Sequence, residues 1–192
     1  MTEIDDLTFR SILRLFASGV AVVTTLDGDR PWGTTVNSFS SVSLHPPLVL
    51  VAFDRRRRIV EPLRRTGRYV VNILGEDDRA LSDCFAGGPG AGSGGASGTG
   101  SVTTSGTSGR EELCGAQWHV GSLGLPVLDA AIASLECSIV DIHPAGDHDL
   151  YIARVEHASA VNADALPLLY YSGRYLRIER ASLHDLRGKP EK

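Results

Sequence analysis

The chain has 192 residues and a mass of 20.5 kDa, with 42% hydrophobic and 22% charged residues, which is enough to bury a substantial core. Nineteen Lys and Arg against 23 Asp and Glu give a formal net charge of -4, which disfavours a basic nucleic-acid-binding protein. The longest apolar run, Leu48 to Phe53, is far too short to span a bilayer. The first residues, Met1 to Asp6, are polar and acidic, unlike a secretory leader. We therefore expect a cytoplasmic protein that binds neither nucleic acid nor a membrane.

Two compositional features concern cysteine and glycine. Cys84, Cys114 and Cys137 are widely spaced and form no Cys-x-x-Cys pair, which is not the pattern of a disulfide framework or a zinc site. Segment 87–109 holds ten of the 21 glycines, many Ser and Thr and no charged residue, so it has little to bury. It lacks the Lys of a P-loop, which disfavours phosphate binding. We expect a flexible loop within a single domain spanning residues 1–192.

In chain order, the first expected element is a helix that Thr8 can cap and Gly19 can end. Its apolar face consists of residues at helical spacing, namely Phe9, Ile12, Leu13 and Phe16. Later helices are expected over 56–66, where Pro62 would end or kink it, and over 77–85. β-branched and apolar runs predict strands over 20–26, 32–42, 48–54, 68–74, 133–143, 148–161 and 168–178. Many strands with short turns and few helices predict a mainly β fold, a closed or nearly closed antiparallel barrel.

The first candidate site is the hydroxyl- and amide-rich stretch 34–43, which precedes Pro46 and Pro47. Strand alternation places Thr35, Asn37 and Phe39 on one face and Val36 and Ser38 on the other. Small polar groups on a strand near the core can hydrogen-bond a flat polar ligand. The alternative is a solvent-facing sheet edge.

The second candidate site is the run of four arginines over 55–58, directly after the buried strand. Guanidinium groups where a strand gives way to a helix can bind a phosphate bidentately, helped by the helix amino terminus. The alternative is a solvated charged face.

The third candidate site is the turn 143–148, His-Pro-Ala-Gly-Asp-His. Histidine titrates near neutrality, so this turn could be catalytic. A metal site formed by turn residues with His119 or His157 is a competing hypothesis, but a turn scatters side-chain directions and no helical His-x-x-x-His exists. A simply exposed histidine is the third possibility.

Taken together, these residues resemble the flavin reductase-like family, the short-chain NAD(P)H:flavin oxidoreductase components of two-component flavin-dependent monooxygenases. The resemblance covers nearly the whole chain except the Gly/Ser-rich segment and the last dozen residues. The matching stretches are 9–10, 18–25, 35–43, 46–50, 54–55, 67–74, 126–129, 135–137, 146–148 and 171–175.

The resemblance implies a six-stranded antiparallel FMN-binding split barrel, usually a homodimer with flavin near the interface. It implies hydride transfer from NADH or NADPH to FMN or FAD, after which reduced flavin diffuses to a partner monooxygenase. Two alternatives on the same barrel are a non-catalytic flavin-binding protein and a flavin oxidase like pyridoxamine-phosphate oxidase. The second should retain its flavin through purification.

The resemblance also assigns roles to residues. Those implied to bind flavin are Thr35, Val36, Asn37, Ser38, Ser41, Ser43, Ala52, Asp54, Arg57, Arg58 and Phe85. Gly146, Asp147 and His148 match the family's Gly-Asp-His motif for nicotinamide, and Asp147 and His148 are the expected catalytic residues. Arg174, in another matching stretch, is also expected to bind a cofactor, with no particular contact assigned to it. The family often has Ser or Thr where this chain has Arg57 and Ile59, and arginine can replace them with charge-assisted bonds.

Overall fold

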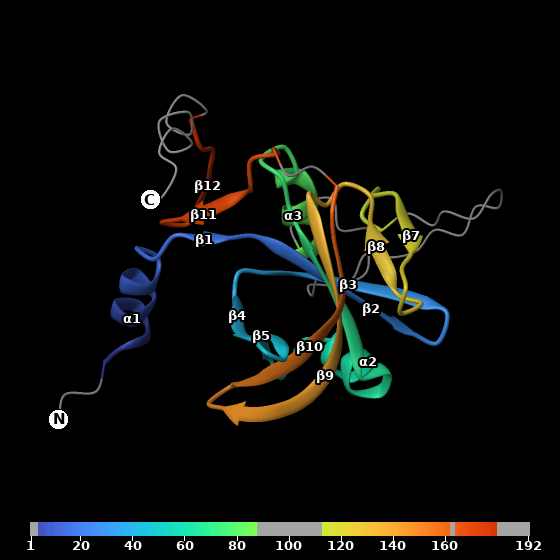
Figure 1. Ribbon diagram of the computed structural model, residues 1–192. Coiled ribbons are helices and arrows are strands. Elements are labelled where there is room, and N and C mark those ends of the chain that lie inside the picture. Colours follow the sequence, from blue (N-terminus) through green and yellow to red (C-terminus); the bar gives the residue numbers. More distant parts are fainter. Residues whose placement is uncertain (1–3, 88–112, 162–163, 180–192) are drawn as a thin grey trace, which may run out of the picture.

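The computed structural model describes residues 4–87, 113–161 and 164–179 (Figure 1). Its main element is a seven-stranded antiparallel sheet in the order β3-β2-β6-β9-β10-β5-β4. The strands are β2 (Ala21–Asp27), β3 (Arg30–Val36), β4 (Phe39–Leu44), β5 (Pro47–Asp54), β6 (Arg68–Ile73), β9 (Ala133–Ala145) and β10 (His148–Ala160). The predicted mainly β, antiparallel fold is confirmed, with seven strands in this sheet instead of six. The Gly/Ser-rich segment expected as a loop lies, apart from Gly87, outside the described residues.

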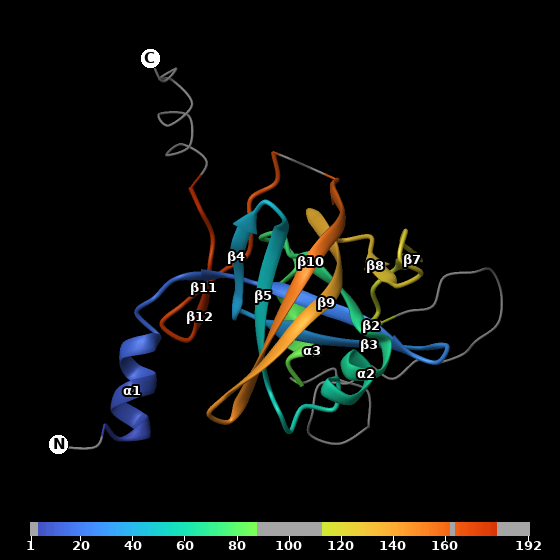
Figure 2. The same cartoon turned by 60° about the horizontal axis from the view of Figure 1, so that its bottom comes forward.

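The sheet curls into a barrel because its two outermost strands, β3 and β4, are consecutive in the chain. Only Asn37 and Ser38 separate them, so the two sheet edges must meet at that point. Figure 2 shows β5 and β10 running across β2 and β3 around the interior. The predicted single strand over 32–42 is therefore wrong, since the chain leaves one edge of the sheet at Val36 and joins the other at Phe39.

In the described part of the chain, three helices accompany the sheet. Asp5, not Thr8, caps α1 (Asp6–Leu13), because the Asp5 carboxylate accepts the Thr8 N–H at 2.9 Å and the Thr8 hydroxyl at 2.7 Å. Pro62 lies in the first turn of α2 (Val60–Thr66), where its missing N–H is not needed and causes no kink. The third helix is α3 (Arg79–Phe85). None of the described helices is long and apolar enough to cross a membrane.

Two small sheets lie outside the barrel. One joins β1 (Ser18–Gly19), β11 (Leu169–Tyr171) and β12 (Arg174–Leu176). The predicted strand over 168–178 is thus a hairpin, whose turn residues Ser172 and Gly173 both have positive φ, 50° and 77°. The other pairs β7 (Trp118–Val120) with β8 (Pro126–Leu128), which the sequence did not predict.

Apolar side chains form two main cores. The barrel interior is filled by residues that include Val51, Tyr69 and Tyr151, each fully buried. A second core lies outside the barrel, between β2, α3 and the segment around β8. There Phe85 packs on Gly33 so closely that a Cβ atom at position 33 would lie 2.4 Å from the ring. Only glycine fits at this position.

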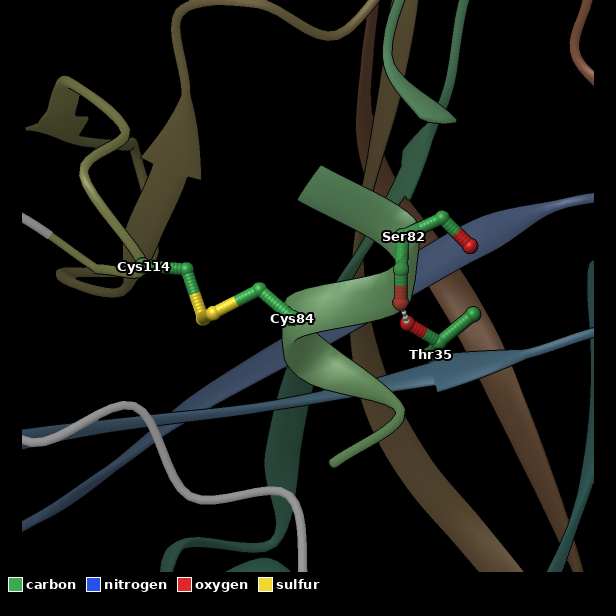
Figure 3. The surroundings of a disulfide bond; sticks show 4 residues. All are labelled: Thr35, Ser82, Cys84 and Cys114. Atoms are coloured by element: carbon green, nitrogen blue, oxygen red, sulfur yellow. Dashed lines mark hydrogen bonds between the residues drawn. A yellow bond between two sulfur atoms is a disulfide. The ribbon is translucent and has the colours of Figure 1, made fainter. Parts of the chain in front are cut away.

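A disulfide joins Cys84 at the end of α3 to Cys114, which corrects the sequence-based expectation (Figure 3). The two cysteines are 30 residues apart and flank the Gly/Ser-rich segment, so their spacing gives no signal of the pair. They meet because α3 and the segment around Leu113 pack into the same outer core. Cys137 is a free, buried thiol in the barrel interior, and burial raises its pKa to about 12.

The buried amide of Asn72 ties three strands together. Its Nδ2 donates to the Val22 carbonyl and to the Thr24 hydroxyl, both at 3.0 Å, and its Oδ1 accepts the Leu128 N–H at 2.9 Å. The side chain is fully buried, so these bonds replace all its hydration. Asn72 thereby fastens β8 to β2 and β6.

We expect Asn72→Ala to lower the free energy of unfolding by about 2–4 kcal/mol, because it leaves buried backbone groups without partners and opens a cavity. Urea denaturation measures the change. Asp29→Ala, in the exposed turn between β2 and β3, is the control and should change stability little. Equal stability of the two variants would contradict the structural role of Asn72.

Candidate functional site

The connection between β3 and β4 offers free backbone donors at an accessible place. Asn37 is exposed and Ser38 half-buried, and no hydrogen bond within the described residues uses their backbone N–H groups. The Ser38 hydroxyl donates to the Ala52 carbonyl at 2.8 Å, which fixes the connection against β5. Two unpaired N–H groups held rigidly beside a strand can bind an anionic or carbonyl oxygen of a ligand.

A half-buried apolar strip runs along the outside of the barrel beside this connection. Val49, Val51 and Phe53 of β5 point into the barrel core, so the alternating residues lie on the opposite face. These outward residues are Leu50, Ala52 and Asp54, with Leu150 and His148 beside the last two in the neighbouring strand β10. The strip thus begins apolar and ends at a carboxylate and an imidazole. A flat aromatic ring can stack on the apolar part of the strip, which consists of Leu50, Ala52 and Leu150.

Gly146 and Asp147 of the Gly-Asp-His motif form the two-residue turn between β9 and β10, and His148 is the first residue of β10. Gly146 has φ +62°, a conformation that favours glycine. Nδ1 of His148 lies 2.6 Å from the Asp147 carboxylate, and this hydrogen bond lowers the pKa of Asp147. The backbone N–H of Arg55 donates to the Asp147 carbonyl at 3.2 Å, so the turn is fixed to the end of β5.

The histidines considered for a metal site do not converge. Nδ1 of His119 lies 2.6 Å from Asp129, whereas Nε2 of His143 lies 2.9 Å from Asp141. Across the part of the chain that the structure describes, no group of three or more His, Cys, Asp or Glu is placed to hold a metal ion.

The four arginines divide into two pairs. Arg55 binds Asp149 at 2.7 Å, and Arg56 binds Asp54 at 2.7 Å and holds the pKa of that carboxyl well below its usual range. Arg57 and Arg58 are exposed and form no ion pair with any described carboxylate. Because α2 begins only at Val60, these arginines lie in the turn before the helix. Within the described residues, the unpaired guanidinium groups of this run are therefore those of Arg57 and Arg58, which follow β5 in the chain.

Several other predicted residues face away from this strip. The Thr35 hydroxyl donates to the Ser82 carbonyl at 2.6 Å, so it secures α3 to β3, as Figure 3 shows. Val36 is buried in the barrel core, and Phe85 is fully buried in the outer core. The Phe85 ring therefore has no surface left for a ligand.

The remaining predicted residues lie at the margins. Ser41 and Ser43 are on the edge strand β4, where Ser43 pairs with Leu48 and its hydroxyl accepts the His45 N–H at 3.2 Å. Arg174 is exposed on β12, in the separate three-stranded sheet. Its neighbour Tyr175 contacts α3, since its hydroxyl lies 2.9 Å from the Ser82 hydroxyl and donates to Asp83. No described interaction brings Arg174 to the strip.

Sequence reasoning missed two parts of the site. The outward residues Leu50 and Leu150 belong to strands that were predicted, and alternation along 48–54 could have indicated the first of them. The buried carboxylate of Asp149, which binds Arg55 and Arg64, left no comparable signal because its partners are more than 80 residues away.

The fold agrees with what known proteins show. Residues 13–179 match the family model "Flavin reductase like domain", so the chain belongs to the flavin reductase-like family. An NADH-dependent flavin reductase from Rhodococcus sp is 36% identical over 180 residues, which cover 92% of this chain and 89% of the relative. The flavin-dependent monooxygenase reductase subunit HsaB of Mycobacterium tuberculosis is 33% identical, with coverages of 92% and 84%. The solved structure of flavin reductase PheA2 in its native state superimposes with a TM-score of 0.76 at 33% identity, covering 92% of this chain and all of that one.

Proposed function

We propose that the protein is an NADH-dependent flavin reductase that transfers a hydride to FMN or FAD and supplies reduced flavin to a partner flavin-dependent monooxygenase. One observation carries the proposal. The free N–H groups of Asn37 and Ser38 and the Gly-Asp-His turn lie at the same end of β5, one beside Ala52 and the other beside Asp54. Hydride transfer needs the donor and acceptor rings in contact, and adjacent sites provide that contact.

The strip has the groups needed to hold a flavin, which supplies the hydride-accepting chemistry when bound. Leu50, Ala52 and Leu150 offer an apolar surface to the ring. The backbone N–H groups of Asn37 and Ser38 would hydrogen-bond its polar edge and stabilise negative charge there. The guanidinium groups of Arg57 and Arg58 would hold the phosphate. Thr35 and Val36 would not contact the flavin. They would fix β3, the strand that leads into the connection at Asn37 and Ser38.

The Gly-Asp-His turn would hold the nicotinamide. The Asp147 carboxylate fixes the orientation of the His148 imidazole, which is then available to orient the nicotinamide or to shield the stacked rings from water. No proton needs to pass through His148, because hydride moves directly between cofactors. The connection at Asn37 and Ser38, the arginine pair and the Gly-Asp-His turn would therefore bind and orient the cofactors. None of them forms a covalent bond to a cofactor.

We also propose that the protein is a homodimer. The predicted apolar residues of α1 are exposed, with Phe9 53% and Ile12 58% accessible, and Phe16, which follows the helix, is 79% accessible. α1 has no buried residue and stands clear of the barrel in both views (Figure 1, Figure 2). On the nearby edge of the barrel, Leu44 of β4 is 82% exposed. Apolar surface of this extent is typical of an interface, and a second copy of the chain would cover it.

Phe9→Glu combined with Phe16→Glu should convert the dimer to a monomer, because each copy would then place charges in the apolar contact. Light scattering after size exclusion measures the mass. Arg10→Glu on the same helix is the matched control and should stay dimeric. A wild-type protein that runs as a monomer at micromolar concentration would rule out the dimer.

Steady-state oxidation of NADH and NADPH with added FMN, FAD or no flavin tests the activity. We expect turnover that saturates with added flavin. Flavin binding without nicotinamide oxidation would indicate a flavin carrier, and flavin retained through purification with no stimulation by added flavin would indicate an oxidase. The cytoplasmic location expected from the sequence remains part of the proposal, although a disulfide is uncommon in that compartment.

A further inference from the structure

A buried carboxylate lies directly beneath the Gly-Asp-His turn. Asp149 is 3% exposed and follows His148 in β10, with its side chain on the face that points into the barrel. Its Oδ1 accepts the Arg55 Nε–H and its Oδ2 accepts an Arg64 Nη2–H, each at 2.7 Å. Two charge-assisted bonds offset the cost of burying this charge and lower the pKa of Asp149, chiefly through Arg55.

Arg55 links the Asp149 carboxylate to the Gly-Asp-His turn. While its Nε–H is held by Asp149, its Nη2–H donates to the His148 carbonyl at 3.2 Å. The backbone N–H of the same residue donates to the Asp147 carbonyl. The backbone carbonyls of Asp147 and His148 thus both accept hydrogen bonds from Arg55.

The other partner of Asp149 comes from α2. Arg64 lies in the last turn of that helix, whose residues Val60 and Leu63 pack into the barrel core. The Asp149 carboxylate is therefore the point at which α2, the end of β5 and the Gly-Asp-His turn are joined. It contacts Arg55 and Arg64 but has no exposed surface with which to reach a dinucleotide.

We propose that Asp149 is a positioning residue of the nicotinamide site, acting through Arg55 on the backbone of Asp147 and His148. The inference rests on the proposed function of His148. Without the carboxylate, the Arg55 side chain turns to solvent and the turn loses the hydrogen bond from Arg55 Nη2 to the His148 carbonyl, so that only the backbone bond from Arg55 to Asp147 remains. His148 then samples orientations that do not support nicotinamide binding, while the strip that would hold the flavin is unaltered.

The test compares Asp149→Asn and Arg55→Met with a matched control, Asp27→Asn, which removes another carboxylate that pairs with an α2 arginine, Arg65 at 3.0 Å. We expect both site variants to raise the KM for NADH roughly tenfold, with FMN affinity within about twofold of wild type. Asp27→Asn should change neither. Because Arg55 is half-exposed, its variant should remain folded even if a change at Asp149 does not.

A double-mutant cycle separates positioning from a general structural role. In a His148→Ala background, Arg55→Met should raise the KM for NADH no further, because its effect passes through His148. Additive effects, or a loss of FMN affinity equal to the change in KM, would overturn the inference. If His148→Ala itself leaves the KM unchanged, the proposed role of His148 fails. If His148→Ala raises it and neither Asp149→Asn nor Arg55→Met does, only the role of Asp149 fails.

Discussion

Replacing His148 with Ala should raise the KM for NADH roughly tenfold while FMN affinity stays within about twofold of wild type. Nδ1 of the imidazole lies 2.6 Å from the Asp147 carboxylate, at the end of the apolar strip on β5 and β10. Loss of the imidazole therefore removes the group proposed to orient nicotinamide. It removes nothing that the flavin ring or phosphate would contact. Initial rates over a range of NADH concentrations, with FMN binding followed by fluorescence, measure both quantities.

His143→Ala is the matched control for this variant. His143 lies on the same hairpin and also pairs with an aspartate, Asp141, yet it precedes the Gly-Asp-His turn. Its replacement should leave the kinetics unchanged. An unaltered KM for NADH in His148→Ala would remove His148 from the site.

Reduction of the Cys84–Cys114 disulfide should lower the free energy of unfolding by about 3–4 kcal/mol. The bond closes a loop whose ends are 30 residues apart, and breaking it gives conformational entropy back to the unfolded chain. Urea denaturation with and without dithiothreitol measures the difference. The double variant Cys84→Ser, Cys114→Ser should have the same free energy of unfolding as the reduced protein, and dithiothreitol should not change it. Identical unfolding curves for the oxidised and reduced protein would contradict a structural role for the bond.

The disulfide also bears on the proposed site, because α3 supports the strand that enters it. Ser82 accepts the Thr35 hydroxyl and Phe85 covers Gly33, and the bond fixes the carboxyl end of this helix. We therefore expect a modest fall in FMN affinity on reduction, smaller than the effect on stability.

The sequence predicts local structure well where a signal is contained in a few neighbouring residues. The β-branched run after Gly19 forms the strand β2, as predicted. Phe9, Ile12 and Leu13 of the predicted amphipathic pattern lie on a helix, which ends at Leu13, before Phe16 and well before Gly19. That same pattern misleads about burial, because no core within the described chain covers the apolar face.

What the sequence could not predict depends on contacts between distant segments. The pairing of Ala52 with Leu150 and of Asp54 with His148 places two motifs side by side, and register of this kind leaves no local trace. The break at Asn37 and Ser38 is equally hidden, since 32–42 looks like one strand until the two sheet edges are known. The family resemblance supplied the expected functions of these motifs, and the structure supplied their proximity.

The most direct test of hydride transfer at this site is anaerobic rapid mixing of the protein and FMN with NADH. We predict that the oxidised flavin absorbance is lost at a rate that saturates with NADH, and that deuterium at the transferred position of NADH slows this loss. In His148→Ala, a higher NADH concentration should be needed to reach the same limiting rate of flavin reduction. Flavin that binds to the protein but keeps its oxidised absorbance in the presence of saturating NADH would contradict the proposed reductase.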